Sequence, residues 1–181
     1  MQAIRKRSSK RSYLRTAAAL CLVLCLALAG ALVQAARSAP VGNSLKRLSV
    51  TLAFPLESTV WRVSDAYGWR ADPFTGKEQF HRGVDLACAE GTPVLAAQDG
   101  VVTLARRSAS YGNYLRLSHA DGVETIYAHM QYLYVRTGEV VQAGQAIGTV
   151  GQTGRATGPH LHFELLRQGI RYDPGGALGL P

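Results

Sequence analysis

Short runs in which hydrophobic and polar residues alternate dominate the chain from Phe54 onward and predict β-strands. The clearest runs lie at 101–104, 114–118, 123–127 and 161–165. Turn-forming pairs separate them, Asp-Gly at 99–100 and 121–122 and Gly-Asn at 112–113. This segment shows little amphipathic helix. Many strands at short spacing predict an all-β domain, built as an antiparallel sandwich or barrel-like sheet.

A different pattern occupies the N-terminus. A basic stretch through Arg15 precedes an apolar run at 17–33, and small residues follow around 35–39. This order is typical of an export signal. A run of about 17 residues is short for a membrane span and slightly long for a signal core, so a cleaved signal peptide and a retained hydrophobic helix both stay open. Either way we expect the rest of the chain outside the membrane, in the periplasm or cell-wall space, secreted or anchored.

The change along the chain from the apolar N-terminal run to short β-rich runs predicts the domain boundaries. Residues 1–35 are expected to form the signal peptide or N-terminal membrane anchor, 36–53 a linker, 54–174 the β-rich domain and 175–181 a C-terminal tail. About 120 residues can bury one hydrophobic core, so no second folded domain is required.

The net charge of +8 is confined to one end of the chain. Seven of the twenty Lys and Arg residues precede Pro40, and no acidic residue does. The rest of the chain contains thirteen Lys and Arg and twelve Asp and Glu. The β-rich domain is therefore nearly neutral, which argues against a nucleic-acid partner. Membrane contact is expected only through the N-terminal apolar segment.

Candidate chemistry lies in the five histidines. His160 and His162 stand two apart in a predicted strand, so both imidazoles project from one face, and Glu164 shares that face as a ligand or as a partner that orients an imidazole. An isolated His-x-His is more often a surface pair than a metal site. Two imidazoles and a carboxylate can nevertheless hold zinc and leave its fourth position to water.

His81 and Asp85 are four residues apart, with Gly83 between them. In a straight strand their side chains would lie about 13 Å apart, at about 3.3 Å per residue. A shared metal therefore requires a bend in the backbone, which Gly83 permits.

The other candidates are single residues. His129 ends a predicted strand, where a histidine is usually structural, and His119 at a hairpin is expected to be structural or solvated. Cys88 is the one cysteine outside the apolar N-terminal run, and we expect a small buried apolar side chain there rather than a metal ligand.

Taken together, the ordered motifs resemble the lysostaphin-type zinc endopeptidases of bacterial cell walls. The motifs are YGWRADPFTG at 67–76, HRGVD at 81–85, GTPV at 91–94, YAH at 127–129 and GPHLHFE at 158–164. The resemblance implies a duplicated hybrid motif fold with a zinc endopeptidase domain at 54–174. It also implies Zn²⁺ held by His81, Asp85 and His162, a catalytic pair of His129 and His160, and a peptidoglycan stem peptide or cross-bridge as substrate.

A second function stays open beside the enzyme. The same fold can serve as a non-catalytic, membrane-tethered regulator or scaffold of cell-wall enzymes, which would add protein partners in the cell envelope. Relatives that have lost catalysis usually lack one of these five residues, whereas all five stand here. The sequence therefore favours the enzyme. Zinc storage fits poorly, since it would call for many exposed histidines or acidic tracts.

Overall fold

The structure is a computed structural model that describes residues 50–180. These residues belong to the second of two compact units in the chain, Leu45–Pro181. The predicted signal peptide or anchor helix and most of the predicted linker lie outside the described residues. Within the described part, no helix is long and apolar enough to cross a membrane.

Strands make up almost all the regular structure of residues 50–180. They are β1 (Arg62–Asp65), β2 (Gly68–Ala71), β3 (Glu78–His81), β4 (Val84–Ala87), β5 (Pro93–Leu95), β6 (Gly100–Ser108), β7 (Gly112–Ser118), β8 (Val123–Leu133), β9 (Val140–Val141), β10 (Ala146–Val150), β11 (His160–Arg167) and β12 (Ile170–Tyr172). A single 3₁₀ turn, Ala120–Gly122, joins β7 to β8. The expectation of an all-β, antiparallel domain is confirmed.

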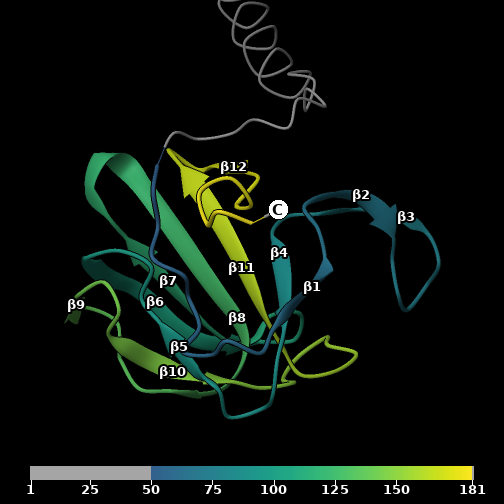
Figure 1. The fold of residues 1–181 in the computed structure, drawn as a ribbon, viewed down its shortest axis with the longest axis horizontal. Coiled ribbons are helices and arrows are strands. Elements are labelled where there is room, and N and C mark those ends of the chain that lie inside the picture. Colours follow the sequence, from purple (N-terminus) through teal and green to yellow (C-terminus); the bar gives the residue numbers. More distant parts are fainter. Residues whose placement is uncertain (1–49, 181) are drawn as a thin grey trace, which may run out of the picture. The chain divides into compact units, whose positions relative to one another are not determined.

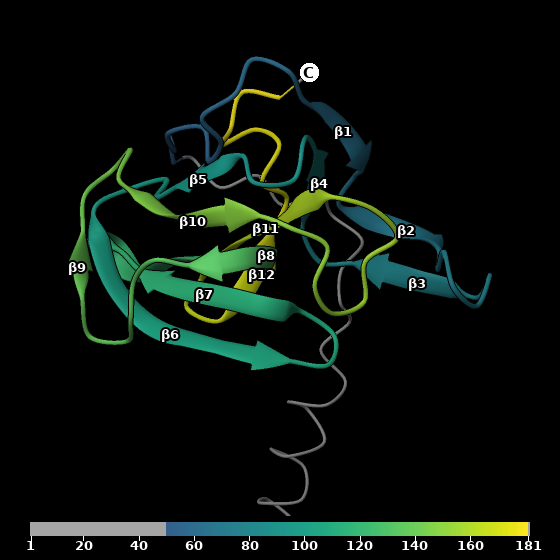
Figure 2. The ribbon, with the colours of Figure 1, turned by 90° about the horizontal axis from the view of Figure 1, so that it is seen from below.

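The large sheet runs in the order β1-β4-β11-β8-β7-β6-β9 (Figure 1). Strand β10 pairs with β8 and with β5, and β12 pairs with β11. Strands β2 and β3 pair only with each other and form a separate hairpin beyond β4 and β1 (Figure 2). Strand β11 therefore lies between β4 and β8, where it can bring residues from three distant parts of the sequence together.

The four strands expected from alternation are present as β6, β7, β8 and β11, each longer than predicted. Of the predicted turns, Asp121-Gly122 connects two strands, while Gly100 and Gly112 each begin one. Gly112 has φ 62°, and a Cβ there would lie 2.3 Å from atoms of Thr153. Only glycine fits this close approach.

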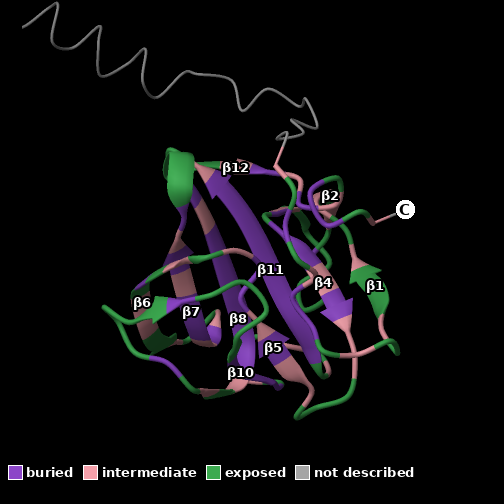
Figure 3. Cartoon of the chain, turned by 60° about the vertical axis from the view of Figure 1, so that its left-hand side comes forward, coloured by how far each residue is buried: buried purple, intermediate pink, exposed green. Residues whose placement is uncertain are grey.

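Strand β11 is buried on both faces (Figure 3). Leu161, Phe163 and Leu165 point into the main core, where burial of each side chain contributes about 1.5–3 kcal/mol. Because side chains alternate along a strand, this packing presents the polar set of β11, which includes His160 and His162, on the opposite face. The core thus fixes the orientation of the candidate site.

The packed unit extends beyond the range 54–174 expected from sequence. Leu52 is buried, and its N–H donates to the carbonyl of Ala177 at 3.1 Å. Ala177 and Leu178 are also buried in the core. Residues assigned from sequence to the linker and the tail therefore pack on the domain; the boundaries otherwise stay predictions.

Candidate metal centre and active site

Strand pairing and one bend in the backbone bring the three predicted metal ligands together. In the antiparallel pair of β4 and β11, Asp85 stands directly opposite His162. Strand β3 ends at His81 and β4 begins at Val84, so the chain turns at Arg82-Gly83, as the sequence required. A Cβ on Gly83 would lie 2.3 Å from the Phe163 carbonyl oxygen, so only glycine lets the bend pack against β11.

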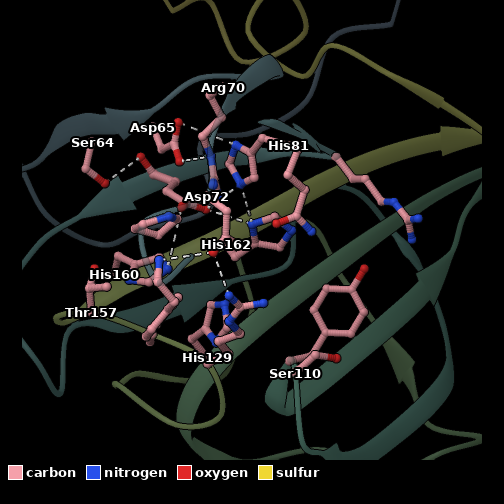
Figure 4. Close-up of a pocket in the computed structure, with 18 of the residues that line it drawn as sticks. Ser64, Asp65, Arg70, Asp72, His81, Ser110, His129, Thr157, His160 and His162 are labelled. Atoms are coloured by element: carbon pink, nitrogen blue, oxygen red, sulfur yellow. Dashed lines mark hydrogen bonds and ion pairs between the residues drawn. The ribbon is translucent and has the colours of Figure 1, made fainter. Parts of the chain in front are cut away.

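Three donor atoms converge at this point (Figure 4). His81 Nε2 lies 3.1 Å from His162 Nδ1 and 3.1 Å from Asp85 Oδ1, and His162 Nδ1 lies 2.7 Å from Asp85 Oδ1. Two ligands about 2.05 Å from a tetrahedral zinc lie roughly 3.3 Å apart. The three atoms therefore stand close to the corners of one face of a zinc coordination tetrahedron.

Hydrogen bonds on the other side of each imidazole fix which nitrogen faces this point. His81 Nδ1–H donates to the Ala66 carbonyl at 2.8 Å, which leaves the Nε2 lone pair free. His162 Nε2–H donates to Glu164 Oε1 at 3.2 Å, which leaves the Nδ1 lone pair free. Neutral imidazoles oriented in this way are typical of metal ligands in proteins. The donor set fits a divalent cation.

Glu164 is the partner of a candidate ligand rather than a ligand itself. Its side chain is fully buried and also accepts hydrogen bonds from the Tyr111 hydroxyl and from Arg171 Nε at 2.7 Å. Burial raises the pKa of this carboxyl, but the hydrogen bonds and charges of His162, Tyr111 and Arg171 outweigh burial and lower it to about 2. Glu164 thus stays ionised and holds the His162 ring in place.

The electrostatics of the three donors favour positive charge between them. Burial alone lowers the pKa of His162, but hydrogen bonds to Asp85 and Glu164 raise it to about 9. The pKa of Asp85 is lowered by His162 and His81 against the effect of burial. The carboxylates of Asp85 and Glu164 thus favour positive charge at His162, and a divalent cation would compete with a proton for this position.

The two predicted catalytic histidines lie together beside the donors. Their ring centroids are 4.8 Å apart, and His160 Nε2 lies 3.7 Å from Asp85 Oδ2. Each Nδ1–H donates to a main-chain carbonyl, of Thr153 for His129 at 2.8 Å and of Gly158 for His160 at 2.7 Å. Both Nε2 atoms are left free to accept a proton.

His129 is held in an uncommon backbone conformation, with φ 62°. The pairing register shifts on both sides of this part of β8, against β7 and against β10. The His129 N–H donates to the Tyr111 carbonyl at 2.8 Å, which stabilises the conformation. Irregularities of this kind re-aim side chains at functional sites. Burial lowers the pKa of His129 to about 4, so the ring is neutral at neutral pH.

The five residues line one cavity of about 450 Å³. The β2–β3 hairpin forms one border, and the 151–159 loop forms another. Arg155 connects them, because its guanidinium lies 2.6 Å from Asp72 Oδ1 and 4.5 Å from the Phe74 ring centroid. These noncovalent contacts of Arg155 thus hold the two borders of the cavity together.

Comparison with known proteins places this geometry in a family. The sequence pattern of peptidase family M23 matches residues 79–174, more than half of the chain, and this range includes all five histidine and aspartate residues of the site. The chain belongs to peptidase family M23. The family resemblance read from the motifs is therefore confirmed.

Individual relatives agree with this assignment. The peptidoglycan DD-endopeptidase ShyC of Vibrio cholerae is 48% identical over 105 residues, which are 58% of this chain and 24% of that protein. A zinc-containing peptidase from Vibrio cholerae has a similar structure, with TM-score 0.62 and 36% identity over 66% of this chain and 37% of that one. The catalytic domain of lysostaphin from Staphylococcus simulans gives TM-score 0.60 and 34% identity over 64% and 90%. The chain thus spans about a quarter of the length of the curated relative.

The remaining candidates from the sequence lie elsewhere in the described part of the chain. His119 is structural, because it is buried and its two ring nitrogens contact the Asp99 carbonyl and the Thr125 hydroxyl at 2.9 and 2.7 Å. Cys88 is half-buried, less buried than expected, and its thiol donates weakly to the Leu86 carbonyl.

Tyr111 and Arg171, which hydrogen-bond to Glu164, are not predicted from the sequence, and neither is the ion pair of Arg155 with Asp72. Tyr111 and Arg155 lie in connecting segments, and Asp72 is 83 residues from its partner. The spacing of residues along the sequence gives no signal of such contacts. Only the alternation of β11 singled out Glu164.

Proposed function

We propose that this chain is a zinc-dependent endopeptidase that hydrolyses peptide bonds in peptidoglycan stem peptides or cross-bridges. The observation that carries the proposal is the convergence of His81 Nε2, Asp85 Oδ1 and His162 Nδ1 beside a second pair of imidazoles. Membership of a peptidase family and a relative named as a peptidoglycan DD-endopeptidase support the reaction and the substrate.

In this proposal His81, Asp85 and His162 hold the zinc, and His129 and His160 are the catalytic residues. Zinc in such a site supplies a Lewis acid and lowers the pKa of bound water to about 7. His129, neutral at neutral pH, would act as the general base and accept a proton at Nε2. His160 Nε2, near Asp85, would either share the proton transfer or, once protonated, donate a hydrogen bond to the developing oxyanion.

We further propose that the enzyme acts outside the cytoplasmic membrane. The basic stretch and the apolar run at 17–33 support export, as a cleaved signal or as an anchor, and peptidoglycan lies on that side.

The test is peptide release from purified peptidoglycan by the full chain in detergent, with zinc and with chelator. We expect new amino termini with zinc, none with chelator, and recovery on adding zinc back. A His129→Ala variant that retains zinc is the matched control. Absence of release at full zinc occupancy would favour the non-catalytic regulator or scaffold instead.

A further inference from the structure

The charged side chains on one border of the cavity are paired. Arg70 forms an ion pair with Asp65, and Arg155 forms one with Asp72. All four residues line the cavity. Within each pair the opposite charges offset each other, so neither arginine offers an uncompensated charge to a ligand.

The carboxylates at the floor of the cavity are also engaged. Glu164 faces Arg171 at 2.7 Å and His162 at 3.2 Å. Asp85 Oδ1 contacts the imidazoles of His81 and His162, and in the proposed function it binds the zinc. A carboxylate that is bound to a cation cannot neutralise a further positive group nearby.

Arg82 is the exception. It lines the cavity between the metal ligand His81 and Gly83, and its side chain is exposed. Among the described residues 50–180, its guanidinium has no ion-pair or hydrogen-bond partner. Its backbone position is fixed on both sides, because His81 is buried and Gly83 packs against the Phe163 carbonyl.

We propose that Arg82 is a specificity-determining residue that binds a carboxylate of the substrate. The proposal rests on the proposed endopeptidase function and identifies the substrate class as peptides with a free carboxylate near the cleaved bond. A guanidinium matches a carboxylate with two parallel N–H···O bonds. An unpaired cation at the rim of a concave site also attracts anionic ligands.

A substrate with a carboxamide in place of the carboxylate tests whether Arg82 recognises the charge of that group. An amide at the same position keeps the size of the group but loses the charge and one of the two acceptor oxygens. Because Arg82 would contact a part of the substrate that does not react, it binds ground state and transition state alike. The preference then lies in KM and in Kd, while kcat stays nearly the same for both substrates.

The test uses two cross-linked stem-peptide dimers that differ only in a carboxylate or a carboxamide nearest the cleaved bond. We expect the full-length zinc-loaded protein to prefer the carboxylate, and Arg82→Gln to reduce the ratio of the two kcat/KM values by roughly fivefold, the upper range for an ion pair open to water. Arg82→Lys should retain part of the preference. Arg136→Gln, which removes an exposed arginine outside the cavity, should retain all of it.

Binding separates this proposal from the proposed function. The same two peptides, made with a ketomethylene group in place of the cleaved amide, are titrated by fluorescence anisotropy, which requires no turnover. A Kd ratio that falls in Arg82→Gln and weakens with salt supports the role of Arg82 even if hydrolysis fails. A ratio unchanged by Arg82→Gln, or equal losses for both peptides, would overturn it.

Discussion

Glu164→Gln is the sharpest perturbation of the candidate metal centre that leaves every proposed ligand in place. The carboxylate accepts hydrogen bonds from Tyr111 and His162 at Oε1 and from Arg171 at Oε2. A glutamine has one acceptor oxygen and one NH₂ group, which only donates. Whichever way the amide is turned, the NH₂ group meets a donor, and the His162 ring or Arg171 loses its partner.

The magnitude follows from that lost partner. Changing a group that orients a metal-bound imidazole lowers metal affinity by about 10–100-fold, or roughly 1.4–2.7 kcal/mol. A buried polar group without a partner costs about 1–3 kcal/mol in unfolding free energy. We therefore expect Glu164→Gln to bind zinc at least tenfold more weakly and to unfold at a lower temperature, with or without chelator.

Competition with a chromophoric chelator measures the zinc affinity, and thermal unfolding followed by circular dichroism measures stability. Glu124→Gln is the matched control, since Glu124 lies on the neighbouring β8 and pairs with Arg116 near the surface. That change should alter stability by under about 1 kcal/mol and leave zinc affinity intact. Wild-type zinc affinity in Glu164→Gln would refute the argument that this carboxylate orients His162.

Three further predictions follow from the same structure. His129→Ala or His160→Ala should retain zinc, measured by mass spectrometry, yet lose about 10²–10⁴ in kcat, since a proton acceptor is removed; activity near wild type would contradict the assigned roles. Burial raises the pKa of Asp72, but hydrogen bonds from Thr75 and Phe74 outweigh burial and lower it below 3.8. The contribution of Asp72 to folding stability is therefore complete above about pH 4 and is lost as the pH falls through the lowered pKa. Asp72→Asn should flatten the dependence of the melting temperature on pH in this acidic range. An unchanged slope would be evidence against this role of Asp72. Gly83→Ala should destabilise by about 1–3 kcal/mol because of its contact with β11, while Gly158→Ala, with open space around it, should be near neutral in the same melt.

The sequence predicts the strands better than their arrangement. Alternation of core and polar residues located β11 and the common face of His160 and His162, because that pattern depends on a strand's own burial. The bend at Gly83 was also foreseeable, since two ligands four residues apart cannot meet in a straight strand. The pairing of Asp85 with His162 was not, because it depends on which strands become neighbours in the sheet.

His129 is the site residue whose orientation is least predictable from the sequence. Its position at the end of a predicted strand suggested a structural histidine, and only the family resemblance singled it out. The observed orientation depends on a positive φ, shifts in register against two strands and a hydrogen bond from its N–H to the Tyr111 carbonyl. None of these contacts has a local sequence signal, because each depends on tertiary packing.

Anomalous X-ray diffraction at the zinc absorption edge, from crystals of the zinc-loaded protein, would locate the ion relative to its three proposed ligands. We expect one strong peak about 2.0–2.2 Å from His81 Nε2, Asp85 Oδ1 and His162 Nδ1, with a fourth position open to the cavity. A peak elsewhere, a fourth protein ligand that closes the site, or the same peak in His162→Ala would contradict it.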